Sequence, residues 1–117
     1  MKYAILIYSD EQRWTSMTPE AGAGMMEQYN KYTADLAAAG VLRGGDELKP
    51  TYTATSVRVR DGKTHSTDGP FAETKEQLGG FYVIETDTLD EAIAWGAKCP
   101  GALHGSIEVR PTASTAM

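Results

Sequence analysis

The segment Tyr3–Tyr8, with the sequence YAILIY, is apolar at every position. Successive side chains of a strand point to opposite faces of its sheet, so both faces of this strand must be covered. The segment therefore predicts a strand near the centre of a sheet. A chain of 117 residues, 41% of them hydrophobic, can form one domain around such a sheet, and a second domain is not expected.

Two amphipathic helices are expected to pack on this sheet. The first begins at Thr18-Pro19-Glu20, where threonine can cap the helix and proline suits its first turn, and it ends at Gly40. The second follows Thr88–Glu91 (TLDE), which has the form of a capping box. Helical spacing predicts the buried stripes: Met25, Tyr29, Tyr32 and Leu36 in the first helix, and Leu89, Ala92, Ile93, Gly96 and Ala97 in the second.

A β-hairpin is predicted in the middle of the chain. The segment Ala54–Arg60 alternates valines with polar residues, which is typical of a half-buried strand, and Asp61-Gly62 is a turn signal before a return strand at Thr64–Thr67. Residues 80–87 and 104–110 are expected to be further strands. Residues 9–17 and 41–50 are expected to be loops, because they are polar or rich in glycine.

The predicted order of elements is strand, helix, hairpin, strand, helix and strand. This order predicts an α+β fold of the ferredoxin-like type, in which two helices cover one face of an antiparallel sheet and a hairpin is added. The opposite face of the sheet would then be bare. A second copy of the chain is the simplest cover for a protein of this size, so we expect a homodimer with facing sheets.

Charge and composition restrict the partners. Sixteen acidic and eleven basic residues give a net charge of −5, which would repel a nucleic acid backbone. No membrane association is expected, because the apolar runs are far shorter than a span and MKYAILIY is too short for a signal core. The single cysteine, Cys99, excludes an internal disulfide and is consistent with a reducing compartment, so we expect a cytoplasmic protein.

His65 is a candidate general base, since histidine titrates near neutral pH, and Asp68 can orient its ring. The face of the hairpin to which the His65 side chain points depends on the preceding turn: a two-residue turn pairs His65 with Arg58, and a three-residue turn pairs it with Val59. A separation of three residues places His65 and Asp68 on opposite faces of a straight strand. A solvated histidine without a catalytic role is therefore the favoured alternative.

His104 begins the last predicted strand and shares a face with Ser106, Glu108 and Arg110. This polar face can border a ligand cleft or form a salt network at an interface, and the structural role is favoured. No metal site and no cofactor are expected, because the two histidines are far apart and metal-ligand spacings are missing. Cys99 follows a predicted helix C-terminus, which disfavours a thiolate, so it is not expected to be a nucleophile.

The segment Asp68–Gly80, DGPFAETKEQLGG, is the strongest candidate for a site. Its first three residues favour a tight turn, and Phe71 is a large apolar side chain that is expected to anchor the loop in a pocket. Glu73 and Lys75 then present charges of both signs. A loop with an aromatic anchor and outward charges is a common border of a small-molecule cleft.

The same segment resembles a family signature. DGPFAETKEQLGGFYVIE, together with KYAILIY, GGDELKP, SVRVRDGK and GSIEVRP, is similar to the DGPF branch of the YCII-related family. The resemblance covers Lys2–Pro111, so residues 1–111 are expected to form a single domain and residues 112–117 a frayed tail. It implies the fold of the dimeric α+β barrel proteins, which agrees with the architecture derived from the pattern of elements.

The resemblance implies little about activity. Relatives in the wider family include a dehydrochlorinase that acts on a chlorinated hydroxyquinol, and YCII-like members carry a histidine and an aspartate in or near the first helix. In this chain Tyr29 and Ala38 stand near those places. That pair is therefore not carried over to this sequence.

Two functions are predicted as alternatives. The first is the binding or transformation of a small phenolic or lactone-like molecule in a cleft bordered by the DGPF segment. The second is an accessory or regulatory role in the circuit of an extracytoplasmic-function sigma factor, because DGPF proteins are often encoded beside such factors. Candidate groups for the first function are the catalytic pair His65 and Asp68 and the binding residues Phe71, Glu73, Lys75, Tyr29, Tyr82 and His104.

Overall fold

The structure, a computed structural model, describes residues 1–113 of the chain. Strands, α-helices and two short 3-10 helices, η1 and η2, follow one another along it. Their bounds are β1 Lys2–Ser9, α1 Glu11–Thr15, α2 Pro19–Ala38, β2 Leu42–Glu47, η1 Thr51–Thr53, β3 Thr55–Arg60, β4 Lys63–Asp68, β5 Gln77–Glu85, α3 Leu89–Lys98, η2 Pro100–Leu103 and β6 Ser106–Pro111.

The body of the protein contains a four-stranded antiparallel sheet with the strand order β2-β5-β1-β6. The Cα of Ile5 in β1 is in register with Tyr82 of β5 on one side and with Val109 of β6 on the other. The predicted central position of the segment Tyr3–Tyr8 is therefore confirmed. With α2 and α3 as the crossover helices, this order is ferredoxin-like, and the predicted α+β fold with an antiparallel sheet is confirmed.

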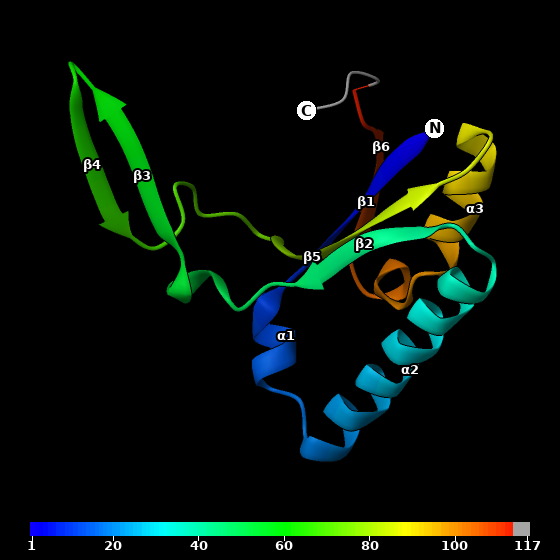
Figure 1. Ribbon diagram of the computed structural model, residues 1–117. Coiled ribbons are helices and arrows are strands. Elements are labelled where there is room, and N and C mark those ends of the chain that lie inside the picture. The colour runs from blue at the N-terminus through cyan, green and yellow to red at the C-terminus, as the bar shows by residue number, and fades with distance from the viewer. Residues whose placement is uncertain (114–117) are drawn as a thin grey trace.

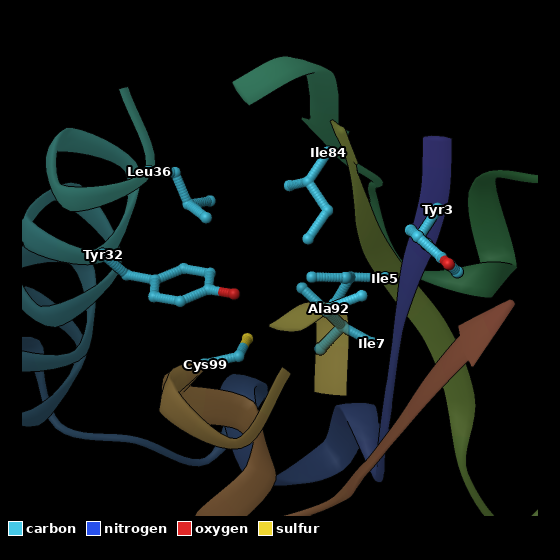
Figure 2. Packing of buried hydrophobic residues seen from close by; sticks show 8 residues of the cluster. All are labelled: Tyr3, Ile5, Ile7, Tyr32, Leu36, Ile84, Ala92 and Cys99. Carbon is cyan, nitrogen blue, oxygen red and sulfur yellow. The ribbon is translucent and has the colours of Figure 1, made fainter. Parts of the chain in front are cut away.

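Helices α2 and α3 cover the same face of the sheet (Figure 1). Tyr32 and Leu36 reach from α2 toward the side chains of β1 and β5 (Figure 2), and Met25 on the same stripe is also buried. Alternate residues of β1 on the other face are only partly covered. The core cluster consists of Tyr3, Ile5, Ile7, Tyr32, Leu36, Ile84, Ala92 and Cys99.

Local sequence signals set the ends of helix α2. The Thr18 side chain accepts a hydrogen bond from an amide of the first turn at 3.2 Å, and Pro19 occupies that turn. At the other end Gly40 adopts a φ of 74°, and the amide of Val41 donates to the carbonyl of Leu36 at 3.2 Å. Glycine favours this left-handed ending because it has no Cβ. The predicted start and end of the helix are confirmed.

Two segments that were expected to be loops contain regular elements. Residues 41–50 include the edge strand β2, which pairs with β5. Most of its side chains are exposed, so it lacks the apolar alternation that signals a strand. Its Gly45 has a φ of 151°, and a Cβ there would approach the carbonyl oxygen of Phe81 to 2.5 Å. Residues 9–17 include the short helix α1, which the Asp10 side chain caps.

Helix α3 begins after its predicted cap, Thr88, but its predicted buried stripe is partly wrong. Ala92 and Gly96 face the sheet, and a Cβ on Gly96 would meet the side chain of Val109 at 3.0 Å. The helix packs through these small residues because they allow its backbone to approach β6. The other residues of the predicted stripe lie outside this contact and are exposed: Leu89, Ile93 and Ala97.

Strands β3 and β4 form a separate two-stranded hairpin that projects from the body (Figure 1). Asp61-Gly62 is a two-residue turn with φ values of 52° and 74°, and Arg58 is in register with His65. The predicted hairpin and the two-residue turn are confirmed. The expected half-burial of its valines is wrong for this chain alone, since Val57 and Val59 are 61% and 58% exposed.

The end of the described chain is tied to β1. The amide and the hydroxyl of Thr112 donate to the carbonyl of Lys2 at 3.0 and 3.2 Å. The part of the predicted tail beyond residue 113 lies outside the described residues. Among residues 1–113, no helix is long and apolar enough to cross a membrane.

Candidate functional site

A cleft of about 340 Å³ opens between helices α1 and α2 and the sheet edge formed by the end of β2 and the start of β5. It lies on the face of the sheet that the helices cover. A cavity of this size is at the small end of the range for ligand pockets, which suits a molecule with one or two rings.

Aromatic rings form one wall of the cleft. Trp14 of α1 and Tyr29 of α2 have ring centroids 6.3 Å apart, and Tyr82 of β5 also lines the cavity. Tyr32 supports Tyr82 from behind in an edge-on arrangement with centroids 5.3 Å apart. Rings fixed in this way offer apolar faces to a planar ligand.

The Tyr82 hydroxyl lies 2.7 Å from Thr33 Oγ1 on α2. Thr33 has a single hydroxyl proton and donates it to the carbonyl of Tyr29 at 2.9 Å, so Tyr82 is the donor in the contact between the two hydroxyls. The Tyr82 oxygen then keeps acceptor capacity. Burial raises the pKa of Tyr82, and the charge of Glu47 adds to this rise, so the hydroxyl is neutral at pH 7.

Glu47 brings a carboxylate to the cleft from the end of β2. No basic side chain within residues 1–113 forms an ion pair with it. Asp46 and Glu11 also line the cavity, with Lys49 as the one basic lining residue from the described chain. Three carboxylates against one ammonium group disfavour an anionic ligand, and Glu47 is an available acceptor for a hydroxyl or an ammonium group.

Glu11 joins α1 to the segment that follows β2. Its carboxylate accepts hydrogen bonds from the amide of Thr51 at 2.9 Å and from the Thr51 hydroxyl, while its own amide donates to the Gln77 side-chain oxygen at 3.0 Å. The Glu11 carboxylate is engaged in hydrogen bonds that connect α1 to the segment after β2. Glu11 is therefore a positioning residue, whereas the Glu47 carboxylate is open to a ligand.

The predicted catalytic pair is not assembled here. His65 is exposed on β4 and lines a second hollow of about 220 Å³ on the hairpin, together with Arg58 and Phe71. Asp68 lies three residues further along the same strand, on the opposite face, and does not line this hollow. The cleft between α1 and α2 contains neither residue.

The DGPF segment is divided between two environments. Residues 77–80 line the larger cleft, whereas residues 68–76 do not. Phe71 is 80% exposed, so the expectation that it anchors the loop in a pocket is wrong for this chain alone. Glu73 and Lys75 are also exposed and lie outside both cavities. Of the predicted binding residues, Tyr29 and Tyr82 line the larger cleft.

His104 follows the 3-10 helix η2, and β6 begins at Ser106, so the expectation that His104 starts the strand is wrong. His104 Nδ1 lies 2.9 Å from Nη2 of Arg13. Because a guanidinium can only donate, Nδ1 is the acceptor in this contact. His104 therefore ties α1 to η2 and does not line the cleft.

Cys99 is buried at the end of α3, and burial raises the pKa of its thiol. Since the thiolate is the reactive form, the cysteine has no setting for nucleophilic catalysis, as expected from its position. Tyr29 lies beside it, and burial raises the pKa of that hydroxyl as well. Among the described residues no cluster of His, Cys, Asp or Glu could hold a metal ion.

Several residues of the cleft were not predicted from the sequence, among them Thr33 and Glu47. Thr33 lies four residues after Tyr29 and so shares its helix face. With Tyr29 as a candidate binding residue, this spacing indicates that Thr33 lies near the same site. Glu47 was in a segment that was expected to be a loop. Its role depends on the pairing of β2 with β5, for which the sequence gives no clear signal.

Residues 1–114 match the family of YCII-related domains. The chain belongs to this family. A relative, an uncharacterized protein of Rhizobium meliloti (strain 1021), is 40% identical over 115 residues, which cover 97% of this chain and 93% of that protein.

A solved structure is similar to this YCII-related domain over its whole length. It is 5-chloro-2-hydroxyhydroquinone dehydrochlorinase from Burkholderia phenoliruptrix AC1100 in complex with 2,5-dihydroxybenzoquinone. The TM-score is 0.50 at 14% identity, and the match covers 97% of this chain and 94% of that chain. At this identity the likeness shows a common fold.

Proposed function

We propose that this YCII-related protein binds a small, uncharged, hydroxylated ring compound of the phenolic or lactone type in the cleft between α1 and α2. The observation that carries the proposal is the combination of aromatic walls with the Glu47 carboxylate in a cavity of about 340 Å³. The dehydrochlorinase with the same fold is named for a hydroxylated ring compound, which supports this class of ligand.

In the proposed complex the ring of the ligand packs against Trp14 and Tyr29, and a ligand hydroxyl donates to the Glu47 carboxylate. The Tyr82 oxygen is a second acceptor at the same wall. Transformation of the ligand would use Glu47 as the base that removes the hydroxyl proton. This assignment replaces the earlier candidates His65 and Asp68, which lie outside the cleft.

Isothermal titration calorimetry with hydroquinone and catechol tests the proposal, and benzoate serves as a ring of similar size that carries a negative charge. We expect binding of at least one phenol and none of benzoate. The variant Glu47→Gln should weaken phenol binding about tenfold or more, since a hydrogen bond to a charged group contributes about 1.5–3 kcal/mol.

The matched control is Tyr52→Ala, which removes an exposed aromatic ring that does not line the cleft. It should bind phenols like the unchanged protein. Equal affinity of the Glu47→Gln variant would contradict the role of that carboxylate, and failure of a wide set of phenols and lactones to bind would overturn the proposed ligand class. Chromatography of the incubated ligand separates binding from turnover.

We also propose that two copies pair through the sheet face that the helices leave open. The apolar residues of this face are only partly covered: Ala4, Leu6, Tyr8, Phe81 and Val83. Pairing of two such faces would remove them from water, which is the usual driving force for a symmetric dimer. Light scattering after size-exclusion chromatography should give twice the chain mass at micromolar concentration.

The regulatory alternative, with an extracytoplasmic-function sigma factor as partner, stays a prediction. A pull-down with the sigma factor encoded beside the gene tests direct contact. No feature of the described residues favours this partner over a small-molecule ligand.

A further inference from the structure

The β3–β4 hairpin gives the chain more surface than a compact monomer of its mass. The accessible surface is 8154 Å² for 12.6 kDa, whereas a compact monomer of that mass exposes about 6,200 Å². The Cα radius of gyration is 16.1 Å, against about 13 Å for a compact domain of this length. The excess surface is larger than the roughly 800 Å² that each partner contributes to a standard interface.

The two faces of the hairpin differ in chemistry. The register places Val57 and Val59 on one face, together with their cross-strand partners Ser66 and Thr64. The other face carries four basic or titratable side chains, Arg58, Arg60, Lys63 and His65. A two-stranded hairpin is marginally stable on its own in water, so an apolar face on such a hairpin indicates a surface that packs against another protein.

The body of the chain offers an apolar surface of the same kind. The open face of the sheet carries Leu6, Tyr8 and Phe81, all of them half-buried. The hairpin projects away from helices α2 and α3, toward the side of the sheet that these helices leave open (Figure 1). The valines remain exposed, so a single chain covers neither the apolar face of its hairpin nor its own open sheet face.

We propose that the β3–β4 hairpin is an exchanged arm: in a dimer, the face with Val57 and Val59 of each copy packs on the part of the other copy's open sheet face that the paired sheets leave uncovered. The inference rests on the proposed pairing of two copies and adds the element that holds them. A twofold axis satisfies both arms and both sheets at once, and it leaves no unpaired surface for further growth.

The charge distribution favours a second copy over other partners. The arm, residues 55–68, carries Arg58, Arg60 and Lys63 against Asp61 and Asp68 and so has a net charge of +1, whereas the whole chain has a net charge of −5. A basic arm is attracted by the acidic body of another copy, which aids association and orientation.

The two ends of the arm lie close together, so the arm can be deleted and replaced by a short link. The amide of Gly69 donates to the carbonyl of Ala54 at 2.7 Å, so the two ends of the arm are adjacent. Replacement of residues 55–68 by two glycines should leave the body intact, which circular dichroism and thermal unfolding can verify. We expect this variant to dimerise at least tenfold more weakly in sedimentation equilibrium than the unchanged chain.

A smaller change separates the two faces of the arm. The double variant Val57→Asp with Val59→Asp should weaken the dimer by a similar factor, because it places carboxylates on the packed face. The matched control Thr67→Asp adds a carboxylate to the opposite face of the same hairpin and should leave the dimer constant within about twofold.

The outcomes distinguish the arm from the pairing itself. A monomeric unchanged chain at all accessible concentrations would overturn both proposals. A dimer that survives arm removal with an unchanged constant, yet dissociates in the sheet variant Leu6→Asp, would overturn the arm and leave the sheet pairing. Hydrogen exchange gives an independent readout: amides of β3 and β4 should lose protection on dilution below the dimer constant, and concentration-independent protection would contradict the arm.

Discussion

Tyr82 donates its hydroxyl proton to Thr33 across the space between β5 and α2, at 2.7 Å. This bond connects the sheet to the helix at the wall of the cleft, and the carbonyl of Tyr29 fixes its direction by accepting the Thr33 proton. The position of the Tyr82 ring therefore depends on Thr33. This residue lies four positions after Tyr29, whose ring belongs to the same wall of the cleft.

The variants Tyr82→Phe and Thr33→Val should each lower the free energy of unfolding by about 1 kcal/mol, because each removes this half-buried hydrogen bond. The double variant should lose less than the sum of the two changes. Urea denaturation measures all three values, with Tyr52→Phe as a control at an exposed ring. Strict additivity would show that the two hydroxyls do not interact in solution.

The edge strand β2 depends on Gly45. A Cβ at this position would lie 2.5 Å from the carbonyl oxygen of Phe81, and the φ of 151° disfavours other residues. The variant Gly45→Ala should therefore cost about 2 kcal/mol or more of stability. The neighbouring variant Gly44→Ala meets nothing within 4 Å and should cost clearly less. Equal costs for the two alanines would contradict the close approach of β2 to β5.

The parts of the fold that the sequence predicts are those with a local signal. The apolar segment Tyr3–Tyr8, the caps Thr18 and Thr88 and the turn Asp61-Gly62 each have a physical cause within a few residues, and the structure places them as expected. Strand β2 has no such cause. It is a strand because β5 offers a partner, and pairing between distant segments leaves little trace in an exposed edge strand.

The site was harder to predict than the fold. Tyr29 lies on a helix stripe and Tyr82 in a strand, so their burial and side followed from the pattern, and both line the cleft. His65 and Phe71 were chosen for their chemistry alone. The hairpin that carries His65 projects from the body, and Phe71 follows this hairpin and is exposed, so chemical type gave no information on their distance from the cleft.

Buried tyrosines make stability fall at alkaline pH. Burial raises the pKa values of Tyr29, Tyr32 and Tyr82 above the ordinary value of 10.0. Above pH 10 the unfolded chain releases these protons while the folded chain retains them, so the stability that is present below pH 10 is lost as pH rises toward the folded values. The loss is at most about 1.4 kcal/mol per pH unit for each group, and it is smaller for Tyr29 and Tyr82, which are partly exposed to solvent.

Tyrosinate absorbance against pH, with circular dichroism on the same samples, measures this effect. Of the six tyrosines, these three should ionise at a higher pH in the folded protein than in the unfolded chain. The variant Tyr32→Phe should reduce the alkaline slope of stability. Complete ionisation of all six tyrosines with an unchanged dichroism spectrum would contradict the burial of the three.

The Cys99 thiol should be protected from thiol reagents in the folded protein. It is 1% exposed, and burial raises its pKa, so both access and the thiolate fraction are low. In the variant Tyr52→Cys, a fast reaction of one thiol should be followed by a slow one, because position 52 is 77% exposed. The slow phase should accelerate in urea in proportion to the unfolded fraction. A native reaction of Cys99 at the rate of the exposed thiol would show that the core around Tyr32 opens without global unfolding.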